Sequence, residues 1–212
     1  MNIYNVIILD ESGSMSSIYK ETLQSMNEVL SGIRKNQEEQ PDQKHNVTIV
    51  TFEGNGIKGI KTRRDRVPVE KVENFTEKDY RPGGCTPLYD AMGQTLNRLE
   101  GLVSEGDKVM ATIITDGYEN ASEEYSGKTI KALVTRLREK GWVLAYIGAN
   151  QDAVEVARDL NISNALNYDA SPEGMIVMSA RFRKASKRMS EFVACEAAPA
   201  MFDQLFSEDD DS

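Results

Sequence analysis

Residues 3–14 read IYNVIILDESGS, an apolar run that leads directly into a polar, glycine-containing loop. The apolar part, Ile3–Leu9, is typical of a strand that is buried on both faces of a parallel sheet. In the loop, Asp10 and Ser14 bracket Gly13, which can take backbone dihedral angles that other residues avoid. Open α/β sheets bind ligands just beyond the carboxyl ends of their strands. The stretch therefore predicts the fold class and, at the same time, the place of a binding site.

Composition narrows the class of protein. The chain has 212 residues, of which 40% are apolar and 28% are charged, and these values fit one compact α/β domain. A domain of this length buries roughly 70% of the surface of its unfolded chain. The net charge of −9, from 25 basic and 34 acidic residues, argues against general nucleic-acid binding, which needs a dominant cationic face.

The sequence predicts a cytoplasmic protein with no membrane span. No apolar run approaches the roughly 20 residues that a spanning helix needs. The amino terminus has no basic region ahead of its short apolar stretch, so we expect no secretory signal. Two cysteines, Cys85 and Cys195, are too few to form a disulfide framework.

Strand and helix patterns alternate along the chain. Short stretches rich in Val and Ile predict strands at Ile3–Leu9, Asn46–Phe52, Lys108–Ile114 and Val143–Ile147, with a weaker one at Ala165–Tyr168. Apolar residues at three- and four-residue spacing, together with helix start and stop signals, predict helices at Ser17–Lys35, Pro87–Ser104, Ser126–Lys140, Asp152–Asn161 and Ser171–Cys195. This order predicts an α/β fold with a mostly parallel sheet and helices on both of its faces.

The segment Gly54–Val72 interrupts the alternation. It contains three glycines followed by two β-branched stretches, and we expect a hairpin-like edge strand there. Its five cations suit an exposed edge that is protected against pairing with another sheet: Lys58, Lys61, Arg63, Arg64 and Arg66. A binding patch for an acidic partner is the alternative interpretation.

The end of the chain divides into a helix and a tail. Large apolar side chains form a stripe along Ser171–Cys195, which predicts contact with the core: Met175, Met178, Phe182, Met189 and Phe192. We expect one domain over residues 1–196 and a short acidic tail over residues 197–212. The last six residues, SEDDDS, have the composition of a disordered segment.

Two further polar segments lie at strand ends or helix starts. Thr86 follows Gly83 and Gly84 just before a helix, and Asp116 closes the buried strand that ends at Ile114. Right-handed crossovers bring the ends of the first and the later strand to the same edge of the sheet. We therefore expect five side chains to converge on one point: Asp10, Ser12, Ser14, Thr86 and Asp116.

These five side chains offer only oxygen atoms. Without a thiolate or an imidazole they suit Mg²⁺, Mn²⁺ or Ca²⁺ better than zinc or copper. Two carboxylates balance a divalent charge, while the three hydroxyls are weak, neutral donors. We expect Mg²⁺, which keeps several exchangeable waters, and a carboxylate from a partner protein as the ligand that completes its coordination.

The three segments together resemble the metal-ion-dependent adhesion site (MIDAS) of von Willebrand factor A-type domains, and the likeness covers residues 1 to about 195. The resemblance implies a doubly wound sheet with one antiparallel edge strand, at Gly54–Val72. It also implies that Ser12, Ser14 and Thr86 contact the metal directly, with Asp10 and Asp116 often acting through water. Because secretory and disulfide features are missing, the chain resembles the stand-alone intracellular branch of the family.

A non-enzymatic protein-binding module is the leading interpretation, with loops containing Met15, Pro87 and Tyr118 contacting the partner. The enzyme alternative is a magnesium-dependent phosphohydrolase of the haloacid-dehalogenase type, but its second aspartate would have to stand where the sequence has Ser12. Cys85 lacks a nearby base, since the single histidine, His45, is expected at the opposite end of the sheet. A third interpretation is an assembly protein whose acidic tail, around Asp210, supplies the metal's missing carboxylate.

Overall fold

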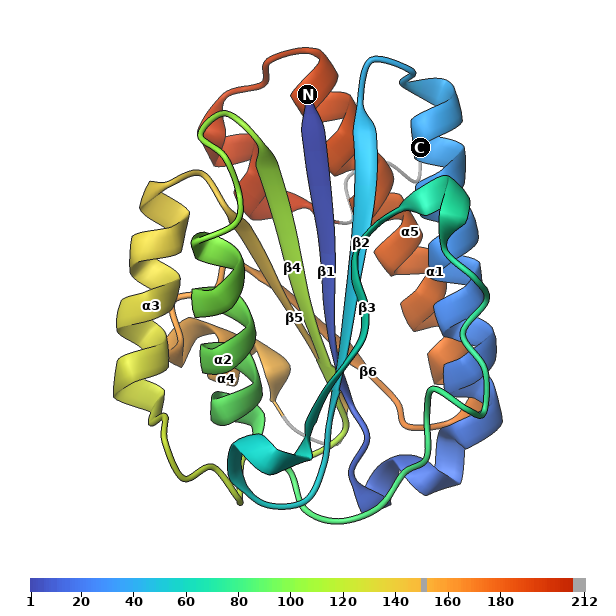
Figure 1. Ribbon diagram of the computed structural model, residues 1–212, viewed down its shortest axis with the longest axis vertical. Helices are drawn as coiled ribbons and strands as arrows, with labels where there is room; N and C mark the ends of the chain where they lie inside the picture. The colour runs from blue at the N-terminus through green and yellow to red at the C-terminus, as the bar shows by residue number, and fades with distance from the viewer. Residues whose placement is uncertain (150–151, 208–212) are drawn as a thin grey trace.

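The computed structural model describes residues 1–149 and 152–207, and the strands in these ranges form one six-stranded sheet (Figure 1). The strands are β1 (Asn2–Asp10), β2 (Lys44–Phe52), β3 (Ile60–Pro68), β4 (Lys108–Thr115), β5 (Val143–Ala149) and β6 (Asn164–Tyr168). Their order in the sheet is β3-β2-β1-β4-β5-β6, with β3 antiparallel to β2 and every other neighbouring pair parallel. The predicted mostly parallel sheet with one antiparallel edge strand is confirmed.

Helices cover both faces of this sheet. One face carries α1 (Tyr19–Glu39) and α5 (Pro172–Ala194), and the other carries α2 (Leu88–Glu100), α3 (Gly127–Glu139) and α4 (Ala153–Asp159) (Figure 1). Val6 and Ile8 of β1 pack in the core under α2–α4, whereas Ile7 and Leu9 pack in the core under α1 and α5. This two-sided burial explains the unbroken apolar run of β1. None of the helices in the described ranges combines the length and the apolar character that crossing a membrane requires.

Side-chain caps set where three of the helices begin. Ser126 and Thr129 form a reciprocal capping box at α3, each side chain accepting a hydrogen bond from the other residue's backbone N–H. Asp152 accepts two backbone N–H groups at the start of α4, and Ser171 caps α5 just before Pro172. The loops that follow β4, β5 and β6 therefore end at defined residues.

Ion pairs hold the edge strand β3 to neighbouring loops. Arg63 Nη2 lies 2.9 Å from Glu11 Oε2, and Arg64 Nη1 lies 2.8 Å from Asp79 Oδ1. The two arginine side chains are only 20% and 17% exposed, respectively. These two cations therefore bind carboxylates of neighbouring loops and are less exposed than the cations of an exposed edge strand would be.

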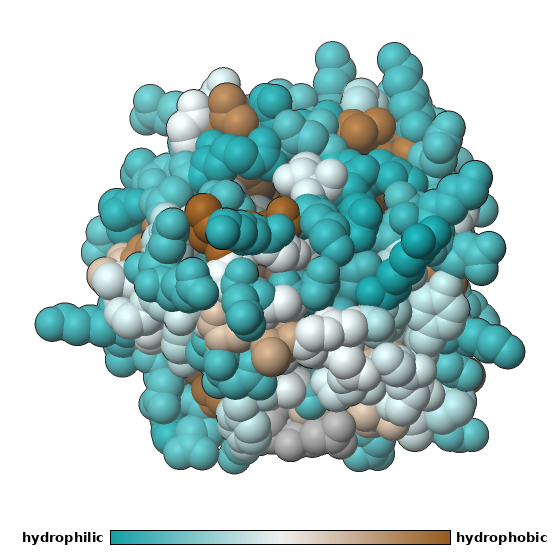
Figure 2. Space-filling view, turned by 60° about the horizontal axis from the view of Figure 1, so that its bottom comes forward, coloured by the Kyte–Doolittle hydropathy of each residue, from teal (hydrophilic) through white to brown (hydrophobic). Residues whose placement is uncertain are grey.

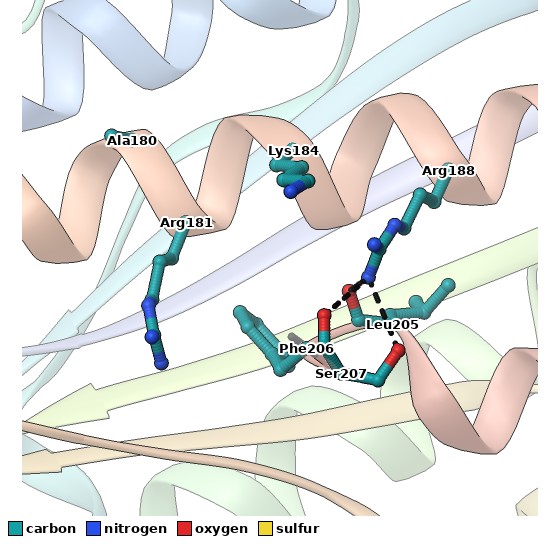
Figure 3. Close-up of a pocket in the computed structure, with 7 residues that line it drawn as sticks. All are labelled: Ala180, Arg181, Lys184, Arg188, Leu205, Phe206 and Ser207. Atoms are coloured by element: carbon teal, nitrogen blue, oxygen red, sulfur yellow. Dashed lines mark hydrogen bonds between the residues drawn. The ribbon is translucent and has the colours of Figure 1, made fainter. Parts of the chain in front are cut away.

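The segment after α5, which the sequence predicts to be a short acidic tail, packs against the domain as far as residue 207. It forms a short 3-10 turn at Pro199–Gln204, and Leu205 is buried in the cluster that contains Ile3 and Met189. Arg188 Nη1 of α5 donates to the carbonyl oxygens of Leu205 (3.1 Å) and Ser207 (2.8 Å), beside a cavity of about 190 Å³ (Figure 3). Of the six residues for which we predict disorder, Ser207 is ordered and bonded to Arg188, and residues 208–212 lie outside the described residues.

Candidate metal centre

Asp10 ends β1 and organises the loop that follows it. Its Oδ1 accepts a hydrogen bond from Ser12 N at 2.7 Å, and its Oδ2 accepts one from Thr115 Oγ1 at 2.6 Å. The side chain is fully buried. Because both carboxylate oxygens are engaged inside the protein, Asp10 holds the Ser12 loop to the end of β4.

The end of β4 brings the second aspartate to the same place. β1 and β4 are parallel neighbours with Leu9 opposite Ile114, so their carboxyl ends meet at one edge of the sheet. Ser14 Oγ donates to Asp116 Oδ1 at 2.6 Å, and the hydroxyl oxygens of Ser12 and Ser14 are 3.2 Å apart. Four of the five predicted ligands are therefore linked by direct hydrogen bonds.

Thr86 reaches this cluster from the start of α2. Its backbone N–H donates to Asn120 Oδ1 at 2.9 Å, and its carbonyl oxygen accepts from Asn120 N at 3.2 Å. A Cβ placed on Gly117 would lie 3.7 Å from Thr86 Oγ1 and 3.9 Å from Ser14 Oγ. Gly117 thus borders a small cradle lined by these hydroxyls, and the structure brings all five predicted residues together.

Glycine at position 84 allows the loops to approach so closely. Gly84 has a φ of +68°, a left-handed conformation, and its carbonyl oxygen accepts from Gly13 N at 3.1 Å. A Cβ here would lie 2.7 Å from Gly54 N and from Glu53 Oε2. Any side chain would push the Thr86 loop away from the end of β2.

The two aspartates sit in surroundings that disfavour their negative charge. Burial raises the pKa of Asp10 to about 6, assisted by the nearby charge of Asp116, although hydrogen bonds from Thr115 and Ser12 oppose the shift. Burial likewise raises the pKa of Asp116, against the hydrogen bond from Ser14. Neither carboxylate forms an ion pair with a cationic side chain in the described part of the chain.

The donor set fits a hard divalent cation. It comprises two carboxylates and three hydroxyls, and over residues 1–149 and 152–207 no three His, Cys, Asp or Glu side chains gather as a metal cluster. Oxygen-only donors favour Mg²⁺, Mn²⁺ or Ca²⁺ over metals that prefer nitrogen and sulfur. A cation beside Asp10 and Asp116 would also offset the cost of burying their charges.

Sequence reasoning missed three residues that support the cluster. Thr115 bonds Asp10 and accepts from Gly117 N at 3.2 Å, and the Tyr80 hydroxyl donates to the carbonyl oxygen of Asp10 at 2.8 Å. The Asn120 side chain anchors Thr86 by accepting a hydrogen bond from its backbone N–H. Thr115 carried a weak signal, since it is the polar residue that ends an apolar strand. Tyr80 carried none.

Two of the three predicted partner contacts need correction. The side chain of Met15 is fully buried in the core under α1 and α5, and Pro87 is buried as well. Met15 is buried because the 3-10 turn Gly13–Ile18 directs this apolar side chain inward. Tyr118, in contrast, is 60% exposed beside Gly117, so its side chain can meet a partner.

The exposed residues next to the predicted ligands in the sequence are uncharged. Figure 2 brings this end of the sheet forward and shows a pale area of intermediate hydropathy next to strongly hydrophilic surface. The exposed neighbours of the predicted ligands in the sequence carry no charge: Gly13, Ser16, Ser17, Gly84, Cys85 and Tyr118. The charges closest to the hydroxyls are those of Asp10 and Asp116, and Glu53 near Gly84 is paired with Lys61 at 3.0 Å.

Cys85 has no base with which to act as a nucleophile. It is exposed at the rim, and its carbonyl oxygen accepts from Gly54 N. His45 pairs with Ile3 at the start of β1, whereas Asp10 pairs with Phe52 at the other end. The histidine is therefore at the opposite end of the sheet from the cluster, as the sequence predicts.

Comparisons with known proteins identify the family of most of the chain. The sequence model of the von Willebrand factor type A domain matches residues 6–187 of the chain. No curated protein matches the sequence.

Several solved structures share the fold. Proximal thread matrix protein 1 from the mussel byssus has a TM-score of 0.63 and 16% identity, over 88% of this chain and 46% of that chain. Another structure of that protein has a zinc-occupied MIDAS motif. The von Willebrand factor type A protein from Catenulispora acidiphila has a TM-score of 0.59 and 14% identity, over 88% of this chain and 42% of that chain. The chain thus spans less than half the length of these solved chains, and at such identities the likeness concerns the fold.

Proposed function

The chain belongs to the von Willebrand factor type A domain family, and we propose that it is a non-enzymatic module that binds a protein partner through a divalent cation at a MIDAS-type site. The observation that carries this proposal is the convergence of five oxygen-bearing side chains at the carboxyl ends of β1 and β4. The family is one of protein-interaction modules, and the mussel protein with the same fold has a zinc-occupied MIDAS motif. The cytoplasmic location and the intracellular branch of the family stay predictions from the sequence.

The residues divide into direct ligands and supporting carboxylates. Ser12, Ser14 and Thr86 would give hydroxyl oxygens to the cation, and Mg²⁺ suits them best among the candidates. Asp10 keeps both oxygens in hydrogen bonds to Ser12 N and Thr115, so its role is to orient the loop and to supply charge. Asp116 accepts a hydrogen bond from the Ser14 hydroxyl through Oδ1. Its other oxygen, Oδ2, could bind the cation directly or through a water molecule.

The partner would supply an acidic side chain. A cation held mainly by neutral hydroxyls would supply an electrophilic position that accepts a carboxylate oxygen from outside the chain. The uncharged rim allows close approach, and Tyr118 is placed to contact residues beside the partner's acid.

The phosphohydrolase alternative fits the geometry less well. Its nucleophile would be Asp10, but that side chain is fully buried with both oxygens accepting hydrogen bonds. Residue 12 is a serine and supplies no carboxyl group for acid–base catalysis. The assembly alternative depends on residues 209–211, which lie outside the described residues.

Metal-dependent stabilisation tests the site. A cation that binds only the folded protein stabilises it by about 2.7 kcal/mol at 100 times its Kd. We expect Mg²⁺ and Mn²⁺ to raise the thermal midpoint of the wild type and of Ser16→Ala, an exposed position in the same turn. Ser14→Ala should lose most of that gain. The metal site is contradicted if the cations do not raise the thermal midpoint of the wild type. It is also contradicted if they raise that of Ser14→Ala as much as that of the wild type.

The partner's acid is tested with model peptides. Two peptides that differ only in one Asp or Asn are titrated into the protein while amide shifts near Gly117 and Tyr118 are followed by NMR. The aspartate peptide should cause shifts with Mg²⁺ present and none with EDTA, and the asparagine peptide should cause none in either condition. Equal shifts with both peptides would reject coordination by a foreign carboxylate.

A further inference from the structure

Glu11 lies between two of the predicted ligands, Asp10 and Ser12, and is an acidic residue with no exposed side-chain surface. Its Oε1 accepts from Arg81 N at 2.5 Å and from Arg63 Nη2 at 3.1 Å. Its Oε2 lies 2.9 Å from the same Nη2 and 3.9 Å from Lys61 Nζ. The carboxylate is thus used within the protein and is not available to a metal.

The backbone of Glu11 also binds two separate segments. Its N–H donates to Phe52 O at the end of β2, at 2.8 Å. Its carbonyl oxygen accepts from Gly83 N, also at 2.8 Å. One residue therefore joins the end of β2, the edge strand β3 and the loop of Arg81 and Gly83, which leads into Thr86.

Arg63 is equally well held. Its Nε donates to Thr51 Oγ1 at 2.9 Å while its Nη2 bonds Glu11, so the planar guanidinium spans β2 and the site loop. A buried carboxylate that loses its cation is strongly disfavoured, because it has already given up its hydration. Without Arg63, Glu11 would be left with Lys61, whose Nζ is 3.9 Å away, and the glutamate would move toward water and carry Ser12 with it.

We propose that Glu11 and Arg63 are positioning residues of the metal centre, which hold the Ser12 and Ser14 loop against the Thr86 loop so that the three hydroxyls are preorganised. This inference rests on the proposed metal site. Groups that orient metal ligands without touching the metal typically change affinity 10- to 100-fold when they are removed.

A purely electrostatic role of Glu11 would change the cation affinity of an Arg63 variant in the opposite direction. If Glu11 acted only through its negative charge, then removing Arg63 would unmask that charge and tighten cation binding. Positioning predicts weaker binding instead. The direction of the change in metal affinity therefore separates the two roles.

The same strand offers a matched control. Arg64 and Asp79 form an ion pair of 2.8 Å, with side chains that are 17% and 15% exposed. Asp79 also accepts from Thr76 N, and losing this pair leaves the hydrogen bonds of Glu11 to Arg63 and Arg81 in place. Arg64→Gln removes a similarly shielded ion pair one residue away from Arg63. It reports what the loss of such a pair does to the fold alone.

The experiment measures the Kd for Mn²⁺ by electron paramagnetic resonance of the free ion, in wild type, Arg63→Gln and Arg64→Gln. Each protein is held well below its thermal midpoint. We expect Arg63→Gln to bind Mn²⁺ about 10- to 100-fold more weakly, with Arg64→Gln unchanged. Arg63→Lys, which keeps the charge but not the fork of donors, should recover part of the loss.

Each outcome decides one question. Unchanged or tighter binding by Arg63→Gln, or equal weakening in both arginine variants, overturns the positioning role. No Mn²⁺ binding by the wild type overturns the metal site itself, and the positioning role with it. If Arg63→Gln does not fold, Glu11→Gln takes its place, because it keeps an acceptor for Arg81 N and removes the charge and the second acceptor that pair with Arg63. Unchanged affinity in that variant would equally overturn the inference.

Discussion

Asp10→Asn should make the metal-free protein more stable at neutral pH while it removes metal binding. The substitution keeps the size of the side chain and an oxygen for Ser12 N. The new amide group would face Thr115 Oγ1, whose hydroxyl has Gly117 O at 3.0 Å as another acceptor. The replacement therefore fits the hydrogen bonds around it and removes only the buried charge.

The magnitude follows from the pKa of Asp10. The value is about 6 in the folded protein and 3.8 in the unfolded chain, so the folded protein binds the proton first as the pH falls. The metal-free protein therefore becomes more stable as the pH falls from 6 to 3.8. Above pH 6 it carries the full cost of burying the charged carboxylate. The penalty amounts to about 3 kcal/mol at pH 7, about 1.6 kcal/mol at pH 5 and about 0.5 kcal/mol at pH 4.

Urea unfolding followed by circular dichroism, in EDTA, measures this difference. Asp10→Asn should be more stable than wild type by up to about 3 kcal/mol at pH 7, and the gap should close toward pH 4. Added Mg²⁺ should stabilise the wild type alone. A variant that is less stable than wild type in EDTA at pH 7, or a gap that does not change with pH, would refute the reasoning.

Three further predictions concern other positions. Burial lowers the pKa of His45 to about 4, so the unfolded chain takes up the proton first as the pH falls, and protonation should lower the free energy of unfolding by about 2 kcal/mol at pH 5. In the same urea assay, His45→Gln should lose this pH dependence. An unaltered pH profile in that variant would contradict the prediction. Tyr168 has a buried hydroxyl without a hydrogen-bond partner in the described part of the chain. Tyr168→Phe should therefore stabilise the protein by about 1 kcal/mol, as measured by thermal unfolding. A clear loss of stability would show that the hydroxyl has a partner. Gly84→Ala should lower the free energy of unfolding by at least about 1–2 kcal/mol, because an L-residue is strained at the positive φ of this position and the new Cβ would press on Gly54. Unchanged stability in the same unfolding assay would mean that the loop relaxes without cost.

The order of elements was predictable from local patterns. Strands buried on both faces need unbroken apolar runs, and the runs at residues 3–9 and 108–114 coincide with β1 and β4. Parallel neighbours end at the same edge, so Asp10 and Asp116 had to lie close together once that order was known. The site could therefore be placed from residue types at strand ends.

What the sequence did not reveal depends on contacts between distant segments. Glu11 and Arg63 are 52 positions apart, and Tyr80 and Asp10 are 70 apart, with no periodic pattern to connect them. Met15 was misplaced for another reason, since a loop position gives no sign of which way its side chain turns. The apolar character of Met15 predicts its burial, because burying such a side chain is favoured by roughly 1.5–3 kcal/mol.

The central claim is tested most directly by anomalous diffraction from crystals soaked in Mn²⁺. We expect one strong anomalous peak bounded by the hydroxyl oxygens of Ser12, Ser14 and Thr86, with the Asp10 carboxylate still bonded to Ser12 N and Thr115. The absence of a peak between these side chains at saturating Mn²⁺, or a peak held by residues elsewhere, would contradict it.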